Sequence, residues 1–209
     1  MTDKPALEAS TPNYAEIYDQ VIAENAGYND AHGSPGYHAC LRYAERLRGL
    51  GGRSLDVGCG AGYVVALLRM PAFGFESYGV DVSATGVERA RKLVSPDCVM
   101  TMQPGAIPHS DSKFSLVTCF DVLEHLDETD ILDLREEMYR VLAPGGLLFC
   151  SASLRPSGSK DHNGENLHRT VRVAQWWANA FEPDEYLVRR ATQEVLFWWT
   201  KPATLQGTC

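Results

Sequence analysis

The chain has 209 residues, of which 44% are hydrophobic and 22% charged, with a net charge of -8 at pH 7. These values are typical of one globular domain, and the acidic balance argues against a large surface for nucleic-acid phosphates. No apolar run approaches the ~20 residues of a membrane span, and the start lacks the basic and then apolar pattern of a signal peptide. We therefore expect a cytoplasmic protein whose partners include neither nucleic acid nor a membrane.

The six cysteines contain no Cys-x-x-Cys pair, so we expect small buried thiols rather than a zinc site or disulfides. Residues 1–11 show no periodicity and are expected to be a mobile N-terminus, followed by one domain over 12–209. Apolar residues at helical spacing predict a helix from residue 14 to 22, and a second helix is expected over 37–47 after a glycine-rich loop. Together these predict a helical lid over 12–49.

A nucleotide-binding turn is predicted where a short apolar run, 53–57, breaks at glycines spaced two apart. Gly58, Gly60 and Gly62 are followed by a helical pattern, which indicates a strand, a tight turn and a helix N-terminus. The next predicted strand ends at Asp81, where a carboxylate can accept from both ribose hydroxyls of an adenosine. Asp56 lies within the first strand, where a buried carboxylate needs partners, so it either orders the glycine turn or meets a cationic ligand group.

Strands and helices alternate through the middle of the chain, which predicts a parallel sheet covered on both faces. We expect strands at 53–57, 77–82, 98–103, 114–120 and 146–152, and helices at 62–69, 84–94 and 128–142. Helix 170–181 and two apolar runs, 186–191 and 195–201, predict a closing antiparallel hairpin. The expected fold is α/β, a doubly wound, Rossmann-like and mostly parallel seven-stranded sheet with a C-terminal hairpin and an N-terminal helical lid.

The glycine turn and Asp81 resemble motif I and the ribose-binding acid of the class I S-adenosylmethionine-dependent methyltransferases. The loop 105–117 resembles the family's loop beside adenine, with Gln103 where the family has an acid. The segment 121–126, Asp-Val-Leu-Glu-His-Leu, resembles the subgroup that includes quinone-biosynthesis O-methyltransferases. The resemblance spans roughly residues 50–153, which are expected to form the cofactor-binding core, with 154–209 as substrate loop, helix and hairpin.

The resemblance implies S-adenosylmethionine as cofactor and S-adenosylhomocysteine as product. The residues expected to contact the cofactor are Tyr14, Asp56, Gly58, Cys59, Gly60, Gly62, Asp81, Val82, Gln103, Phe120, Asp121, Val122 and His125.

Methyl transfer is an in-line displacement that needs alignment and, for an oxygen or nitrogen acceptor, a base. The candidate bases are Asp121, Glu124, His125, His162 and His168, with His125 and His168 expected to be catalytic because imidazole titrates near neutrality. His125 has two other interpretations, cofactor packing and a share in a divalent-metal site with Asp121, Glu124 and His168. The metal is possible but not favoured.

Substrate contacts are expected in the lid and in the loop 154–169, which follows the fifth strand of the core. In the lid they are Tyr18, Tyr28 and His38, although aromatic side chains at helical spacing more often serve packing. In the loop, Arg155 and Arg169 suit a carboxylate or phosphate, with a solvated charged loop as the alternative.

The expected function is methyl transfer from S-adenosylmethionine to an O or N atom of a small metabolite, by a monomer or homodimer. The alternatives are a catalytically silent cofactor-binding partner protein and an NAD-dependent oxidoreductase, which the glycine spacing disfavours.

Overall fold

The structure is a computed structural model that describes residues 12–24 and 30–203. The segment 1–11 expected to be mobile and the predicted substrate contact Tyr28 lie outside the described residues. The helices are α1 (Tyr14–Glu24), η2 (Ala31–Gly33), α2 (Pro35–Arg42), α3 (Ala44–Arg48), α4 (Tyr63–Arg69), α5 (Ala84–Leu93), η3 (Pro96–Cys98), η4 (Leu123–His125), α6 (Glu128–Val141) and α7 (Ala174–Phe181). The strands are β1 (Arg53–Val57), β2 (Glu76–Asp81), β3 (Val99–Thr101), β4 (Phe114–Phe120), β5 (Leu142–Ser153), β6 (Glu185–Arg189) and β7 (Glu194–Thr200).

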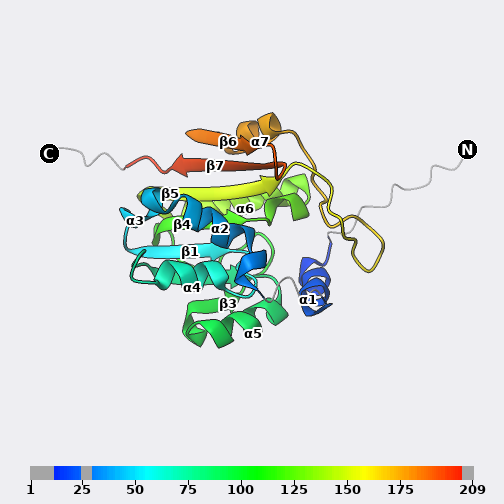
Figure 1. The fold of residues 1–209 in the computed structure, drawn as a ribbon, viewed down its shortest axis with the longest axis horizontal. Helices are drawn as coiled ribbons and strands as arrows, with labels where there is room; N and C mark the ends of the chain where they lie inside the picture. The colour runs from blue at the N-terminus through cyan, green and yellow to red at the C-terminus, as the bar shows by residue number, and fades with distance from the viewer. Residues whose placement is uncertain (1–11, 25–29, 204–209) are drawn as a thin grey trace, which may run out of the picture.

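The seven strands form one sheet in the order β3-β2-β1-β4-β5-β7-β6. Strands β1 to β5 pair in parallel, whereas β7 runs antiparallel to both β5 and β6. The predicted fold class is therefore confirmed, including the closing hairpin. Strand order reverses between β1 and β4, and ligands of such sheets bind beyond the carboxyl ends of the strands at that point. In Figure 1 these ends point toward α1 and the loop after β5.

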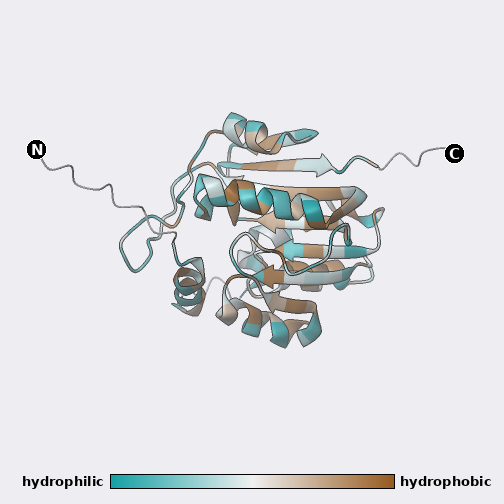
Figure 2. Ribbon diagram, turned by 180° about the vertical axis from the view of Figure 1, so that it is seen from behind, coloured by the Kyte–Doolittle hydropathy of each residue, from teal (hydrophilic) through white to brown (hydrophobic). Residues whose placement is uncertain are grey.

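Both faces of the central strands of the sheet are buried. One core cluster joins α6 and α7 to the sheet, and another joins α2, α3 and α4 to the opposite face. Figure 2 shows the brown, hydrophobic residues gathered on the central strands and the teal residues on outward turns of the helices. This pattern is what a parallel sheet requires, because crossover helices cover both faces.

Helix α1 is attached to the core by polar contacts at two points. Asp19 accepts hydrogen bonds from the Ser83 hydroxyl at 2.6 Å and from the Thr85 backbone N–H at 2.8 Å, at the start of α5. The Tyr14 hydroxyl donates to Asp130 at 2.5 Å and accepts from the backbone N–H of Asp127 at 3.0 Å, at the start of α6. Because both attachment points follow carboxyl ends of strands, α1 covers the mouth of the site.

Two predicted helices have different bounds. The helix expected over 37–47 is broken at Tyr43, whose ring packs edge-on against Phe149 and Trp198, so tertiary packing outweighs the continuous helical pattern. The helix expected from residue 170 begins only at Ala174. Thr170 instead donates its backbone N–H to the Glu124 carbonyl and its hydroxyl to the Leu126 carbonyl, which holds this stretch extended.

Strand β5 begins earlier than residue 146, because Leu142 already pairs with Phe114, and the register against β4 then shifts before Leu116 pairs with Leu147. Gly145 and Gly146 exchange backbone hydrogen bonds with Lys201 beyond β7, so this glycine pair supports the sheet end. Among the described residues, no helix is both long and apolar enough to cross a bilayer.

Candidate functional site

The glycine turn joins β1 to α4. The backbone N–H groups of Gly58 and Cys59 both donate to the Val80 carbonyl, at 2.8 and 3.0 Å. Gly58 has φ +74°, and a Cβ there would lie 2.2 Å from Val122 Cγ2. Gly60 has φ +48° with open space beside it. The first glycine is therefore needed for close packing, whereas Gly60 leaves room for a ligand.

Gly62 and Cys59 have structural neighbours on the helix side of the turn. A Cβ on Gly62, which has φ +82°, would lie 2.9 Å from the Cβ of Ala90 in α5. The Cys59 thiol packs against Gly79 of β2, where an added Cβ would be 2.8 Å from its sulfur. Burial raises the pKa of this thiol well above its usual range. Gly62 thus lets two helices approach closely, and Cys59 is an unreactive packing residue that also borders the site.

Asp81, at the end of β2, is buried and borders a cavity that we call the inner cavity. Its carboxylate accepts from the Gly60 N–H at 2.7 Å and from the Ser83 N–H at 2.8 Å. Burial raises the pKa of this carboxyl, an effect that both backbone hydrogen bonds oppose. The residues around the inner cavity are Tyr14, Tyr18, Ile22, Gly58, Gly60, Asp81, Val82, Met102, Pro104, Gly105, Asp121, Val122, His125, Leu126, Asp130 and Leu134.

Asp56 borders a second space, the glycine-turn cavity, of about 300 Å³. The residues around it are Asp30, Gly33, Ser34, Pro35, Gly36, Asp56, Gly58, Cys59, Gly60, Ala61, Tyr63, Val64, Phe120 and Asp121. Asp56 accepts a hydrogen bond from the Thr118 hydroxyl at 2.7 Å, and burial raises its pKa to about 7. Among the described residues, no N–H of the turn donates to this carboxyl, which leaves the cationic ligand group as the partner that the cavity can still supply.

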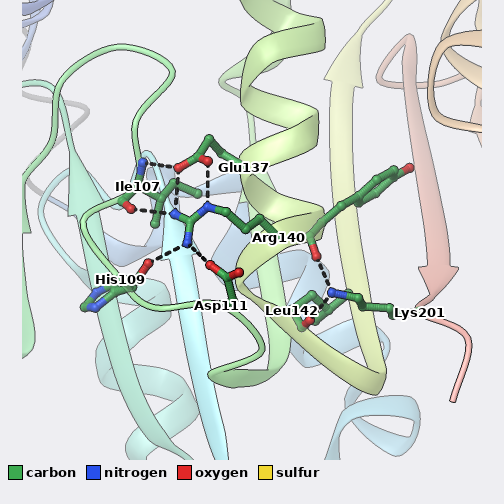
Figure 3. A network of polar contacts seen from close by, with 8 residues as sticks. Ile107, His109, Asp111, Glu137, Arg140, Leu142 and Lys201 are labelled. Carbon is green, nitrogen blue, oxygen red and sulfur yellow. Dashed lines mark hydrogen bonds and ion pairs between the residues drawn. The ribbon is translucent and has the colours of Figure 1, made fainter. Parts of the chain in front are cut away.

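The loop between β3 and β4 is held by a single arginine (Figure 3). Arg140 of α6 donates to the carbonyls of Ile107 and His109 and forms ion pairs with Asp111 and Glu137, each at 2.7 to 2.9 Å. Glu137 also accepts from the Ile107 N–H at 2.8 Å. Four charge-assisted contacts, three from Arg140 and one to Glu137, thus fix the loop that continues from the wall of the inner cavity.

Gln103 lies on the outside of this loop. It is exposed and does not border the inner cavity, whereas its neighbours Met102, Pro104 and Gly105 do. At Met102, Pro104 and Gly105, beside the predicted adenine site, the wall of the inner cavity therefore consists of apolar side chains and backbone.

Asp121 follows β4 and has φ +58°, a left-handed conformation that costs free energy outside glycine and recurs at functional sites. It borders the inner cavity, the glycine-turn cavity and a larger outer cavity of about 860 Å³. The residues around the outer cavity are Val21, His32, Gly33, Pro35, His38, Leu41, Arg42, Asp121, His125, Ser153, Arg155, Ser157, Gly158, Ser159, Leu167, His168, Arg189, Thr192 and Glu194. Asp121 therefore stands where the three spaces meet.

His125 and His168 lie side by side, with ring centroids 4.8 Å apart and planes nearly perpendicular. The Nδ1 atom of His125 is 2.9 Å from the Leu167 carbonyl, and that of His168 is 2.6 Å from the Arg155 carbonyl. A carbonyl only accepts, so each Nδ1 carries the proton and, in the neutral ring, each Nε2 keeps a lone pair. Burial lowers the pKa of His125 to about 4, so its ring is neutral at physiological pH.

Glu124 is fully buried beside this pair. Its Oε1 accepts from the Ser153 N–H at 2.8 Å, whereas Oε2 has no hydrogen-bond partner among the described residues. Burial, together with the nearby Asp121, raises the pKa of Glu124 well above its usual range. Glu124, His125 and His168 each offer one ligand atom, and these atoms lie within 4.8 Å of one another.

The predicted substrate contacts fall in different places. His38 and Arg155 border the outer cavity. Tyr18 borders the inner cavity, with its ring edge-on to His125 at 5.4 Å between centroids. Arg169 lies outside both cavities and pairs with Asp127 at 2.8 Å, so its guanidinium is already engaged at the start of α6.

Sequence reasoning missed several residues around the cavities. Arg42 borders the outer cavity one helical turn after His38, and this spacing within α2 is a signal that predicts a shared face. Asp130 borders the inner cavity and binds Tyr14, whereas Arg189 and Glu194 reach the outer cavity from the hairpin. Nothing in the local sequence indicates these last contacts, because each depends on how distant elements pack.

Comparison with known proteins agrees with this geometry. The model of the methyltransferase domain family matches residues 55–150. Carboxy-S-adenosyl-L-methionine synthase of Chromohalobacter salexigens is 32% identical over 130 residues, covering 57% of this chain and 48% of the relative. Ubiquinone biosynthesis O-methyltransferase of Vibrio cholerae is 29% identical over 147 residues and 57% of each chain is covered. The chain thus spans about half the length of the curated relatives it matches.

Solved structures share the fold at low identity. A chain from the complex between the Haloferax volcanii Trm112 methyltransferase activator and a methyltransferase superposes with a TM-score of 0.70 at 16% identity, covering 88% of this chain and 97% of that one. The matched residues 55–150 include the glycine turn, Asp81 and the segment that carries Asp121 and His125. Residues 55–150 thus match the methyltransferase domain family, and the fold is that of the class I S-adenosylmethionine-dependent methyltransferases.

Proposed function

We propose that the chain transfers a methyl group from S-adenosylmethionine to an O or N atom of a small metabolite. The observation that carries this proposal is the position of Asp121 and His125, which border both the inner cavity and the outer cavity. A methyl donor in the inner and glycine-turn cavities and an acceptor in the outer cavity meet at these two residues. Methyl transfer requires this in-line proximity above all.

The cofactor sites follow from the chemistry of the walls. The inner cavity, with the apolar Val82, Met102 and Leu134, suits the adenine ring, and Asp81 is placed to accept from the ribose hydroxyls. The glycine-turn cavity suits the amino-acid end, whose ammonium group would favour ionised Asp56. S-adenosylmethionine supplies an electrophilic methyl group on a positive sulfur.

His125 is the proposed general base. As the acceptor oxygen or nitrogen forms its bond to the methyl carbon, the carbon–sulfur bond breaks, sulfur keeps the electron pair, and the acceptor proton moves to Nε2 of His125. The Leu167 carbonyl holds this tautomer, and the depressed pKa keeps Nε2 free to accept. His168, edge-on to His125, is placed to orient the acceptor or to share this role.

Isothermal titration calorimetry with S-adenosylhomocysteine tests the cofactor site. We expect Asp81→Ala to weaken binding about 100-fold, because charge-assisted hydrogen bonds to the ribose are lost and buried N–H groups become unpaired. Asp97→Ala, at an exposed position of η3, is the matched control and should bind like the parent. Absence of binding to the parent protein would overturn the proposal.

Turnover separates this function from the alternatives. Incubation with methyl-labelled S-adenosylmethionine and fractionated metabolites should label a small molecule. Binding without turnover would support the silent partner protein, and label only on RNA or protein would refute a small-molecule acceptor. Mass spectrometry of the recovered cofactor tests for modification of the cofactor itself, as the name of the Chromohalobacter relative suggests.

A second arrangement at the same site is a divalent metal that positions the acceptor oxygen. The observation that favours it is Glu124 Oε2, a buried oxygen that accepts no hydrogen bond from the described residues, in a cluster in which Glu124, His125 and His168 each offer a ligand atom within 4.8 Å of the others. One carboxylate and two imidazoles suit Zn²⁺, and carboxylate oxygens suit Mg²⁺. The two roles of His125 exclude each other, since one Nε2 lone pair cannot bind a cation and accept the substrate proton.

Chelation distinguishes the two roles. If His125 is a base, EDTA leaves turnover unchanged; if the three side chains hold a metal, EDTA abolishes turnover and Mg²⁺ or Zn²⁺ restores it. We also expect metal binding to release a proton from Glu124, because burial raises the pKa of this carboxyl and so favours its protonated form in the metal-free protein. A proton release that disappears in Glu124→Gln would therefore support the metal.

A further inference from the structure

The outer cavity has an unusual charge distribution for a chain with a net charge of -8. Three arginines, Arg42, Arg155 and Arg189, border it, against two carboxylates, Asp121 and Glu194. Arg189 and Glu194 form an ion pair at 2.6 Å and neutralise each other. What remains is Arg42 and Arg155 against Asp121, so the formal charge of the cavity wall is positive.

These two arginines differ from their neighbours in having no anionic partner. Arg169 pairs with Asp127, and Arg172 pairs with Glu128. Within the described parts of the chain, by contrast, the Arg42 side chain makes no hydrogen bond or ion pair, and the Arg155 guanidinium has only a 3.5 Å contact with the Pro156 carbonyl. Two guanidinium groups beside one cavity are therefore free to bind a ligand.

Arg155 is held on an ordered loop rather than a loose one. Its carbonyl accepts from Nδ1 of His168 at 2.6 Å, and its N–H donates to the Ser153 hydroxyl at 3.4 Å. Asn166 fixes the neighbouring Ser157 by donating to its carbonyl at 2.9 Å and accepting from its N–H at 3.0 Å. The residue that carries the free guanidinium thus also sets the tautomer of a proposed catalytic histidine.

Resting on the proposed function, we propose that the methyl acceptor is an anion whose carboxylate or phosphate is bound jointly by Arg42 and Arg155. Guanidinium binds both groups through paired, charge-assisted hydrogen bonds. Asp121, where the three cavities meet, repels an anion and so favours its binding at the two arginines. The acceptor is thereby oriented with its nucleophilic O or N atom toward Asp121 and His125.

The test uses inorganic phosphate and acetate as probes of the ¹⁵N-labelled protein saturated with S-adenosylhomocysteine. The Nε–Hε signals of Arg42 and Arg155 are followed by NMR during the titrations. We expect both signals to shift together and to saturate at the same probe concentration. Phosphate saturating at lower concentration than acetate would identify a phosphorylated acceptor, and the reverse order a carboxylated one.

Variants sharpen the test. Arg42→Gln or Arg155→Gln should weaken probe binding about tenfold or more at the remaining arginine, because one charge-assisted partner is lost. Arg48, exposed and paired with Glu45, is the control, and Arg48→Gln should leave probe binding unchanged. Shifts that never saturate, that appear equally at Arg48, or that survive in one arginine after loss of the other would overturn the inference. Cofactor binding in the same samples reports on the proposed function separately.

Discussion

The cofactor side and the acceptor side of the site are built in different ways. On the cofactor side, Asp81 and the glycine turn are fixed by short hydrogen bonds to backbone groups of adjoining strands. On the acceptor side, the wall comes from three separate segments, 32–42, 153–168 and 189–194, and ends in exposed arginines. The first is part of the sheet edge, whereas the second is a set of side chains carried by surrounding elements.

This difference separates what any methyltransferase of this fold must keep from what selects its acceptor. In the proposed site, backbone conformation and burial position the cofactor, so a small change there is expected to affect every reaction. Exposed side chains on α2 and on the loop after β5 position the proposed acceptor, and they can change with little cost to the fold. Substitutions on the two sides should therefore separate cofactor binding from acceptor chemistry.

The largest effect is expected on the cofactor side, from Gly58→Ala. The added methyl group would lie 2.2 Å from Val122 Cγ2, at a backbone φ of +74°. We expect a loss of ~3 kcal/mol or more in unfolding free energy and loss of measurable S-adenosylhomocysteine binding. Urea unfolding and calorimetry measure both. Gly49→Ala, where nothing lies within 4 Å, is the control and should be nearly neutral; equal behaviour of the two variants would contradict this account of the turn.

At the boundary between the two sides, His125→Gln should reduce kcat by about 100-fold or more while cofactor affinity changes little, since a general base contributes 10²- to 10⁴-fold. In the parent, the acid limb of the rate profile should lie near pH 4 rather than 6.5, because burial depresses the His125 pKa to about 4. His162→Gln is the matched control and should leave kcat unchanged, because this candidate base is exposed on the loop 154–169 and borders none of the three cavities. An unchanged kcat in His125→Gln would remove this residue from the chemistry.

A smaller, pH-dependent effect is expected at Asp56. Burial raises its pKa from an ordinary value of 3.8 to about 7, so the folded protein holds a proton that the unfolded chain releases. The contribution of Asp56 to the free energy of unfolding is fully present below pH 3.8 and is lost as the pH rises through about 7. The total change amounts to up to ~4 kcal/mol. Asp56→Asn should flatten that part of the stability profile in urea unfolding without ligand. A parent and a variant with parallel profiles between pH 4 and 7 would show that the carboxyl titrates normally.

The smallest effect is expected from Gln103→Ala. Because this side chain is exposed and does not border the inner cavity, affinity for S-adenosylhomocysteine should change by less than about threefold. A tenfold loss by calorimetry would instead show that Gln103 reaches the adenine ring when the cofactor is bound, as its alignment with the family's acidic residue predicts.

Much of the cofactor side was predictable because its residues are close in sequence and obey local rules. Three glycines before a helical pattern predict the turn, and an acid at the end of a strand predicts the position of Asp81. The predictions that differ from the structure depend on distant partners. Tyr43 breaks a helix by packing against Phe149 and Trp198, and Thr170 delays another by bonding to carbonyls near η4.

The sequence by itself determined the sheet, its crossover helices, the hairpin and the glycine turn, since periodicity, glycine and proline act over a few residues. Only the tertiary structure decided which charged side chains are free. Arg155 and Arg169 look equivalent in the sequence, but Asp127 at the start of α6 pairs with Arg169 and not with Arg155. Arg42 joins Arg155 at one cavity from more than a hundred residues away, because strand order and packing, rather than chain proximity, bring α2 beside the loop after β5.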